Sequence, residues 1–453
     1  MSREMKNSGV GWIGEIPEDW TIRKIKFSLN EHIEKNDPIK SKNILSLTAK
    51  QGVIPLSKRE GGGNKPKEDF SAYKLAYPGD IVMNSMNIIS GSVGLSNYFG
   101  CMSPVYYMLR PVHKEDDVRF YNYVFQSKPF QLSLFGLGNG ILVKQTDNDK
   151  FNTVRLRIPM DKLGDVGIPN ISPTEQQQIV HFLDRKCTAI DTAIEKTKKS
   201  IEKLEEYKKA VITKAVTKGI DPNAKMKDSG VEWIGEIPKG WDAIRIKYTL
   251  QDGIIKSGPY GSALKEIATD SSNGQYPIYN QANVINNNFD LRRNHISDEN
   301  YERMKNYAIH AGDIVFSMMG TVGKCSIVPD GIEKGIIDSH LFEAKLCEKV
   351  NKEYFRYSYD KDFCTLVYEQ FIEAMNGSIM NGLNGTLIKN VFICLPSLTE
   401  QTRIVHFLDR KCTAINTAIE KKKKAIEKWE EYKKSLIYYA VTGKIDCRNE
   451  VIE

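Results

Sequence analysis

The chain contains a near-copy of itself, because two segments of its first half return in the same order in its second half. The segment Ser8-Gly-Val-Gly-Trp-Ile-Gly-Glu-Ile-Pro-Glu-Asp-Trp20 returns as Ser229-Gly-Val-Glu-Trp-Ile-Gly-Glu-Ile-Pro-Lys-Gly-Trp241. A longer segment, from Thr174 to Asp221, returns from Thr399 to Asp446 with about three quarters of its positions identical. Each copy must adopt the same structure, so the repeat predicts a protein built from two equivalent halves.

The segments between the copies, roughly residues 28 to 170 and 249 to 395, barely match each other. Two short anchors survive in both: a Gly-Asp-Ile-Val run that ends at Val82 and Val315, and a Gly-x-Val-Gly run that ends at Gly94 and Gly323. We therefore interpret these segments, called here the variable blocks, as one fold that carries two different surfaces.

Short apolar runs such as Asp80-Ile-Val-Met and Asp313-Ile-Val-Phe predict strands in the variable blocks. Stretches near residues 118 to 134 and 351 to 375 predict helices, and the many Gly, Asn, Ser and Tyr residues predict extended loops. The predicted fold class is therefore α+β.

The long duplicated segments predict helices that pack through a coiled-coil seam. Their apolar residues step alternately by four and three positions, which is the 3.5-residue period of two packed helices. Pro173 and Pro396 precede the helices, and Gly219 and Gly443 end them. The predicted seam residues are Leu183, Ile190, Ile194, Ile201 and Leu204 in the first helix and Leu408, Ile415, Ile419, Ile426 and Trp429 in the second. Lys208 and Lys433 also fall on the seam, and they depart from a regular apolar stripe.

The order of the segments predicts how the helices run. A helix of about 40 residues is roughly 60 Å long. The first variable block leads directly into the first helix, and the second motif begins about a dozen residues after that helix, so the two blocks are expected at its opposite ends. Burying both seams then requires the second helix to run antiparallel to the first, which gives the monomer a pseudo-two-fold axis.

Composition excludes several classes of protein. Hydrophobic residues make up 41% and charged residues 27% of the chain, a balance typical of globular proteins. No apolar run approaches the roughly 18 residues needed to span a membrane, and residues 1 to 10 are too polar for a signal peptide. The eight cysteines form no CxxC pair, which favours reduced thiols over disulfides or a zinc site. The net charge of +7 permits nucleic-acid binding without demonstrating it.

No catalytic constellation can be assembled from the sequence. Gly320-Thr-Val-Gly-Lys324 has the wrong glycine spacing for a phosphate-binding loop, and Cys325 stands where Ser or Thr would hold magnesium, so we interpret it as a turn. No glycine motif for S-adenosylmethionine or a dinucleotide is found, and the seven histidines form no metal or triad signature. We therefore expect a protein with no catalytic residues and no metal site.

The variable blocks instead contain polar loops suited to nucleic acid. Glycines permit a close backbone approach, amides can read adenine, and Arg or Lys can contact phosphates or guanine. Any one of these residues, taken alone, is more simply a turn former or a solubilising charge. The candidate DNA-binding residues are Lys58, Arg59, Asn64, Lys65, Lys67, Asn84 and Asn87 in the first block, and Lys256, Ser257, Tyr260, Ser262, Lys265, Asn280, Gln281, Asn283, Arg292 and Arg293 in the second.

These features together resemble the specificity subunit of type I restriction-modification systems. The resemblance is carried by the duplicated Trp-Ile-Gly-Glu-Ile-Pro-x-x-Trp motif, by the Thr-Glu-Gln...Ile-Val-x-Phe-Leu-Asp helix openings and by the Gly258-Pro-Tyr-Gly-Ser262 loop. It spans essentially the whole chain, and the layout of the repeat agrees with the motifs.

The resemblance implies a cytoplasmic, non-catalytic subunit in which two target recognition domains are separated by two long antiparallel coiled-coil helices. Each domain would read one of two unequal half-sites in double-stranded DNA. The implied boundaries are residues 1–170 for the first motif and target recognition domain, 171–220 for the central helix, 221–395 for the second motif and domain, and 396–453 for the distal helix and C-terminus.

The resemblance also implies partners. Modification subunits, expected to be two, would dock on the helices and supply the S-adenosylmethionine site and adenine methylation. Restriction subunits, which combine a motor and a nuclease, would use ATP and Mg. This chain itself would hold no cofactor and would contact no membrane.

Two alternatives stay open at the level of sequence. A stand-alone DNA methyltransferase or nuclease is disfavoured by the missing motifs, and methyl transfer by the purified chain would revive it. A coiled-coil scaffold that binds proteins through its variable blocks would bind DNA weakly and without the steep salt dependence that phosphate contacts cause.

Overall fold

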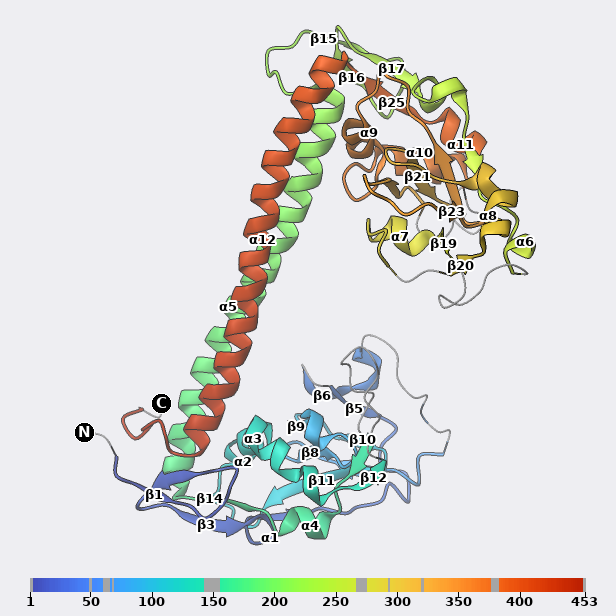
Figure 1. Ribbon diagram of the computed structural model, residues 1–453. Helices are drawn as coiled ribbons and strands as arrows, with labels where there is room; N and C mark the ends of the chain where they lie inside the picture. Colours follow the sequence, from blue (N-terminus) through green and yellow to red (C-terminus); the bar gives the residue numbers. More distant parts are fainter. Residues whose placement is uncertain are drawn as a thin grey trace. The chain divides into compact units, whose positions relative to one another are not determined.

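The structure is a computed structural model that describes residues 3–48, 51–59, 66, 69–141, 155–265, 275–291, 294–318, 322–375 and 383–450. The chain forms two compact units. Unit 1 contains Met1–Thr197 and Lys424–Glu453, and unit 2 contains Lys198–Lys423. Two long helices, α5 (Pro173–Lys218) and α12 (Leu398–Val441), pass through both units, so each unit holds one part of each helix (Figure 1).

Unit 1 combines short strands with short helices around the first part of α5 and the last part of α12. Its strands are β1 (Met5–Asn7), β2 (Glu15–Pro17), β3 (Thr21–Lys24), β4 (Leu29–Glu31), β5 (Leu45–Thr48), β6 (Gly52–Pro55), β7 (Lys74–Ala76), β8 (Ile81–Asn84), β9 (Val93–Leu95), β10 (Gly100–Met102), β11 (Tyr106–Pro111), β12 (Asn139–Ile141), β13 (Arg155–Arg157) and β14 (Gly167–Asn170). Its helices are α1 (Ile25–Ser28), α2 (Val118–Gln126), α3 (Lys128–Ser133), α4 (Met160–Gly164) and the 3-10 turns η1 (Leu56–Lys58), η2 (Ile88–Ser90) and η3 (Leu134–Leu137).

Unit 2 repeats this mixture around the last part of α5 and the first part of α12. Its strands are β15 (Met226–Asp228), β16 (Glu236–Pro238), β17 (Asp242–Arg245), β18 (Lys256–Ser257), β19 (Tyr276–Tyr279), β20 (His295–Ile296), β21 (Ile314–Ser317), β22 (Cys325–Ile327), β23 (Ile336–Ile337), β24 (Leu341–Ala344) and β25 (Phe392–Leu395). Its helices are α6 (Gly261–Lys265), α7 (Gln281–Ile285), α8 (Asp298–Met304), α9 (Lys352–Tyr359), α10 (Leu366–Ala374), α11 (Gly385–Asn390) and the 3-10 turns η4 (Ile246–Tyr248), η5 (Gln251–Gly253) and η6 (Lys305–Tyr307).

The two variable blocks share one sheet topology, although their sequences barely match. Unit 1 contains an antiparallel sheet in the order β4-β11-β8-β9, and unit 2 contains an antiparallel sheet in the order β18-β24-β21-β22. The apolar runs predicted as strands form β8 and β21, and the predicted helical stretches contain α2, α3, α9 and α10. The α+β prediction and the interpretation of one fold with two surfaces are confirmed.

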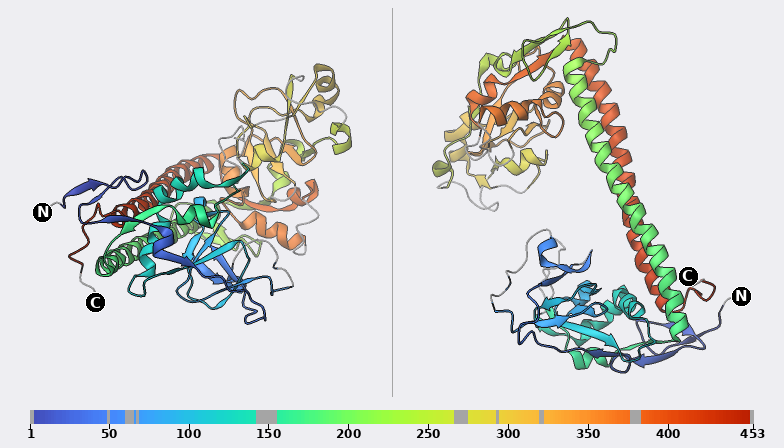
Figure 2. Two further views of the ribbon diagram at one scale, coloured as in Figure 1. Left: turned by 90° about the horizontal axis from the view of Figure 1, so that it is seen from below. Right: turned by 180° about the vertical axis from the view of Figure 1, so that it is seen from behind.

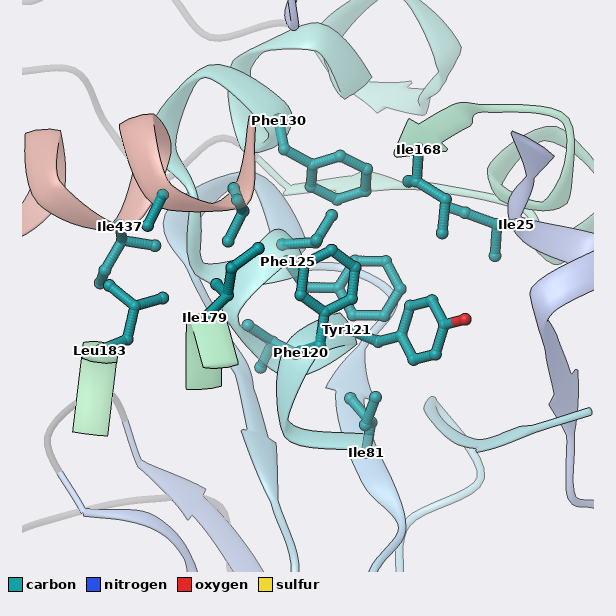
Figure 3. Close-up of a cluster of buried hydrophobic side chains, with 14 of the residues drawn as sticks. Ile25, Ile81, Phe120, Tyr121, Phe125, Phe130, Ile168, Ile179, Leu183 and Ile437 are labelled. Carbon is teal, nitrogen blue, oxygen red and sulfur yellow. The ribbon is translucent and has the colours of Figure 1, made fainter. Parts of the chain in front are cut away.

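The first three residues of β8 and of β21 are apolar because both faces of each strand are covered. In β8, Ile81 and Met83 join the core that includes α2 and α3, whereas Val82 packs into a second cluster with Met108 of β11. Figure 3 shows Ile81 in the first of these cores, with Phe120, Tyr121, Phe125 and Phe130 from α2 and α3 and with Ile179, Leu183 and Ile437 from the long helices. A strand covered on both faces needs no polar alternation, which explains the continuous Ile-Val-Met run.

Each long helix begins at a duplicated capping sequence. The Ser172 hydroxyl accepts the backbone N–H of Glu175 at 3.2 Å, and the Ser397 hydroxyl accepts that of Glu400 at 3.3 Å. The Ser-x-x-Glu spacing is the signature of a capping box, so these side chains fix where each helix starts. The carboxylates of both glutamates accept a further hydrogen bond from an indole N–H: Trp20 donates to Glu175 at 3.0 Å, and Trp241 donates to Glu400 at 2.9 Å.

The same tryptophans contact the end of the other long helix. In unit 1, a Cβ placed on Gly443, just beyond α12, would lie 3.0 Å from the Trp20 ring. In unit 2, a Cβ placed on Gly219, just beyond α5, would lie 3.3 Å from the Trp241 ring. Each tryptophan therefore joins the start of one long helix to the end of the other, and the predicted antiparallel pairing is confirmed within each unit (Figure 2).

The seam between the helices is buried at most of its predicted positions. Leu183, Ile190, Ile194, Leu408, Ile415 and Ile419 are buried, and Ile201, Leu204 and Ile426 are half-buried. Trp429 differs from the prediction, because its side chain is 40% exposed and its ring lies edge-on to Tyr432 of the same helix.

The two polar seam residues pair across the helices in equivalent ways. In unit 1, the Lys433 ammonium contacts the Asp191 carboxylate at 2.6 Å, and in unit 2 the Lys208 ammonium donates to Asn416 Oδ1 at 2.9 Å. Asp191 and Asn416 are equivalent positions of the repeat, as are Lys208 and Lys433. The lysines are therefore cross-helix pairs that help to select the register, as polar seam residues do in coiled coils.

We expect Gly443→Ala to destabilise unit 1 more than Gly9→Ala does. Both glycines have φ of +73°, so both substitutions cost about 1–2 kcal/mol of left-handed backbone strain. Only the new methyl group at Gly443 would meet protein atoms, since it would lie 2.5 Å from Pro17 Cδ, whereas nothing lies within 4 Å at Gly9. The overpacking should add about 1–3 kcal/mol. Urea unfolding of both variants, followed by circular dichroism, measures the difference, and equal losses would contradict the contact.

Candidate nucleic-acid interface

The polar residues that differ between the two units lie at one end of the shared sheet. We call this the variable end: in unit 1, β8 finishes there and β11 begins, with Asn84 opposite Tyr106. In unit 2, β21 finishes there and β24 begins, with Ser317 opposite Leu341. The four-residue strands β8 and β21 each follow the shared Gly-Asp anchor, so Asn84 and Ser317 are equivalent positions.

The shared anchor explains why the variable end can change without disturbing the sheet. The Asp80 carboxylate accepts the backbone N–H of Tyr77 at 2.8 Å, and the Asp313 carboxylate accepts that of His310 at 2.8 Å. Both aspartates thereby close the turn that leads into the central strand. The start of each strand is fixed by the same chemistry, which leaves the residue at its other end free to differ.

The variable end of unit 1 borders a hollow of about 790 Å³. Arg59, Asn84 and Asn87, all predicted from the sequence to bind DNA, line this hollow together with Ser46 and Tyr106. The Arg59 guanidinium donates to the Ser46 hydroxyl at 3.2 Å. The structure therefore brings three candidate residues from two segments into the lining of one hollow, which they share with apolar side chains.

The hollow has a positive group beside a half-buried phenol. Burial raises the pKa of Tyr106, while the nearby Arg59 charge and a hydrogen bond with Asn84 act in the opposite direction. The backbone N–H of Met86 donates to Asn84 Oδ1 at 3.0 Å, which fixes the orientation of that amide. Neutral hydroxyls, an oriented amide and a guanidinium are the groups that bind base edges and phosphates.

Among the described candidates of the first block, Lys58 does not line the hollow. Lys58 ends η1 and is exposed to solvent. Asn64, Lys65 and Lys67 lie outside the residues that the structure describes.

In unit 2, the Gly258-Pro-Tyr-Gly-Ser262 loop lies at the variable end because it follows the edge strand β18, which pairs with β24. The backbone N–H of Gly258 donates to Leu341 O at 3.0 Å. A Cβ at Gly258 would lie 1.8 Å from Asp338 O, so only glycine permits this approach. The loop leaves Tyr260 87% exposed, and Lys256, Ser257 and Ser262 are also exposed.

The three predicted amides of the second block have different roles. Asn280 caps α7, and its Oδ1 accepts the backbone N–H of Ala282 at 2.9 Å. Asn283 is fully buried, with Oδ1 accepting the Asn280 N–H and Nδ2 donating to Asn288 O. Gln281 is partly exposed, and its Oε1 accepts the Ser317 hydroxyl at 2.7 Å, which places it at the variable end. Asn280 is also partly exposed, with its Oδ1 used by the cap of α7, whereas the amide of Asn283 is buried. The base contacts of these residues stay predictions.

The last candidates of the second block cannot be placed. Lys265 ends α6, but its side chain lies outside the described part of the chain, as do Arg292 and Arg293.

Three residues at the variable end are not among the DNA-binding candidates predicted from the sequence: Ser46, Tyr106 and Ser317. Ser46 and Tyr106 reach the hollow only through strand pairing, so no local pattern marks them. Ser317 could have been found, because it stands at the same distance from the Gly-Asp anchor as Asn84.

Lys324, the last residue of the run that is similar to a phosphate-binding loop, forms ion pairs within unit 2. The Lys324 ammonium contacts the Asp360 carboxylate at 3.2 Å and the Asp362 carboxylate at 2.6 Å. Within the described ranges, no group of three or more His, Cys, Asp or Glu residues could hold a metal ion. No helix among the described residues is long and apolar enough to cross a membrane.

We expect Asn283→Ala to lower the free energy of unfolding of unit 2 by about 1–3 kcal/mol, because it removes two hydrogen bonds of a fully buried side chain. Asn286→Ala is the matched control at the C-cap of α7, since Asn286 is exposed and its Nδ2 donates to Ala282 O at 2.8 Å. It should cost about 0.5 kcal/mol or less. Thermal unfolding of the two variants measures both losses, and an unaffected Asn283→Ala would argue against the capping role.

Comparison with known proteins also indicates similarity to DNA specificity subunits. A family model described as "Type I restriction modification DNA specificity domain" matches residues 253–428. A Methanocaldococcus jannaschii protein assigned as the specificity subunit of the type I restriction enzyme MjaX is 25% identical over 96% of this chain and 95% of its own length. The MjaVIII specificity subunit of the same organism is 23% identical over the same shares.

Two solved structures share the fold. A chain from a study of complex assembly and conformational transition of the type I R-M system has a TM-score of 0.64 at 15% identity, and the match covers 95% of this chain and 99% of that chain. The HsdS subunit from Thermoanaerobacter tengcongensis has a TM-score of 0.50 at 15% identity, with 95% and 98% covered. Each match covers nearly the whole of this chain, so the shared fold includes both units and both long helices. By its duplicated motifs and its full-length relatives, the chain is similar over nearly its whole length to the specificity subunits of type I restriction-modification systems.

Proposed function

We propose that this chain selects the DNA target of a type I complex by reading two unlike half-sites, one with each variable block. The helices would set the separation of the half-sites, and the catalytic steps would belong to partner subunits. The chain would act in the cytoplasm, where DNA and those partners are present.

One observation carries this proposal: the two sheets have the same strand order but different groups at the same place. The variable end of unit 1 presents Arg59, Asn84 and Tyr106, whereas that of unit 2 presents Tyr260 and Gln281. A fold that is kept while its surface chemistry changes is what two different base sequences require. Amides, guanidinium groups and hydroxyls are also the groups that distinguish base pairs in the major groove.

The long helices offer docking surfaces for modification subunits. Outside the seam they carry many Glu and Lys residues, yet Tyr432 and Tyr439 of α12 and Tyr207 of α5 remain exposed. Exposed aromatic residues are enriched where proteins associate. Because Tyr207 and Tyr432 are equivalent positions of the repeat, we propose two modification subunits, one for each copy.

The cofactors would be held by those partners. We propose that the modification subunits bind S-adenosylmethionine and that the restriction subunits use ATP and Mg, while this chain contributes recognition alone. The position of the methylated adenine would then follow from how each unit places its half-site.

The test of the proposal is an exchange of residues 28–170 for the corresponding block of another specificity subunit, followed by methylome sequencing of a host that expresses the complex. We expect one half-site of the methylated target to change and the other to remain. The reciprocal exchange of residues 249–395 is the matched control and should change the other half-site. A change of both half-sites in either hybrid would contradict modular reading.

A second measurement separates this proposal from a protein-binding scaffold. The chain assembled with its modification subunits should bind a target duplex with an affinity that falls steeply as salt rises, because phosphate contacts release counterions. Each phosphate contact should contribute about 0.9 to the slope of log K against log salt concentration. Weak binding without salt dependence would favour the scaffold.

A further inference from the structure

We propose that Gln281 is the residue of unit 2 that reads a purine edge in the second half-site, and that Ser317 positions it. This inference rests on the proposed function and adds to it the base chemistry and the residue pair. Three features of the variable end support it: the place of Ser317 in the fold, the orientation of the Gln281 amide and the use of the neighbouring amides by α7.

The first feature is the place of Ser317. It ends β21 at the position that Asn84 occupies at the end of β8, two residues after the Gly-Asp-Ile-Val run that both units share. Ser317 is buried, and its hydroxyl is aimed at a side chain that is partly exposed. The sheet therefore holds the hydroxyl in place, and the Gln281 side chain bonded to it presents its amide at the surface.

The second feature is the orientation of the Gln281 amide. The Ser317 hydroxyl donates to Gln281 Oε1 at 2.7 Å, and this bond holds the amide oxygen at the end of β21. Nε2 makes no hydrogen bond with the described part of the chain, so its two N–H donors remain for a ligand, and Oε1 keeps one lone pair. A glutamine held in one orientation loses less conformational freedom on binding than a free one.

The third feature is the environment. Asn283 is fully buried with both amide atoms hydrogen-bonded, and Asn280 uses its Oδ1 to cap α7, so neither amide can accept from one base edge and donate to it as Gln281 can. The backbone N–H of Met318 donates to His340 O at 3.0 Å, and that of Gly258 donates to Leu341 O. The strand ends that carry Ser317 and the loop that carries the exposed Tyr260 therefore meet at the same end of the sheet.

This chemistry matches a purine in the major groove. Nε2 can donate to N7, which adenine and guanine share, and the remaining lone pair of Oε1 can accept from the N6 amino group of adenine. Guanine offers O6 at that place, an acceptor that cannot donate to Oε1. The expected base is therefore adenine, and guanine would use the N7 contact alone.

The experiment uses the chain assembled with its modification subunits, after methylome sequencing has given both half-sites. Competition binding is measured on duplexes in which each base pair of the second half-site is replaced in turn. Gln281→Ala should lose about ten-fold discrimination at one base pair and keep the wild-type preferences throughout the first half-site. Asn286→Ala, at the exposed residue that directly follows α7, is the matched control and should keep all preferences.

Two further comparisons test the assigned contacts. A 7-deazapurine at the sensitive position should weaken binding of the wild-type complex but not of the Gln281→Ala complex, and 7-deazaadenine against 7-deazaguanine identifies the purine. Ser317→Ala should lower discrimination at the same position by a smaller factor and should have no further effect in the Gln281→Ala background. That non-additivity would distinguish positioning from a general loss of stability, because destabilisation would act in both backgrounds.

The outcomes separate this inference from the proposed function. If the wild-type complex recognises no second half-site, the proposed function itself fails. If it recognises one and Gln281→Ala keeps every preference, or if 7-deazapurines weaken the wild-type and variant complexes equally, only the assignment of Gln281 is overturned.

Discussion

Each unit depends on a tryptophan that joins the start of one long helix to the end of the other. Trp20 donates its indole N–H to Glu175 in the first turn of α5 and packs beside Gly443 after α12. Trp241 makes the equivalent contacts with Glu400 and Gly219. Because a single ring contacts both ends, the helices in each unit can only run antiparallel, and this pairing gives the variable block a fixed base on which to fold.

Further duplicated hydrogen bonds extend from that base into the variable blocks. The Tyr123 hydroxyl donates to Asp184 at 2.6 Å, and the Tyr357 hydroxyl donates to Asp409 at 2.7 Å. Burial raises the pKa of both tyrosines, so each stays a neutral donor at physiological pH. The helix α2 or α9 is thereby attached to a long helix by the same bond in both units. The sequence of each block can then diverge on the side away from these contacts without loss of the fold.

This division explains how specificity can change within a constant architecture. The contacts with the long helices, the Gly-Asp anchor and the central strand repeat in both units, whereas the groups at the variable end do not. Asn84 with Tyr106 and Arg59, and Gln281 with Ser317, are supported by one sheet topology. A scaffold of this kind can exchange its recognition chemistry because the energetics of folding and of binding are carried by different residues.

Periodicity and copied motifs are local properties of the chain, so they are enough to predict the repeat, the α+β class, the two long helices and most of their seam. Local composition also predicts Arg59, Asn84, Asn87 and Gln281 as polar loop candidates. The folded arrangement decided which candidates come together, since Ser46, Tyr106 and Ser317 reach the variable end through strand pairing between distant segments. It likewise decided that Asn283 is buried and that Lys208 and Lys433 have partners on the facing helix, because hydrogen bonding and burial depend on neighbours that lie far away in the sequence.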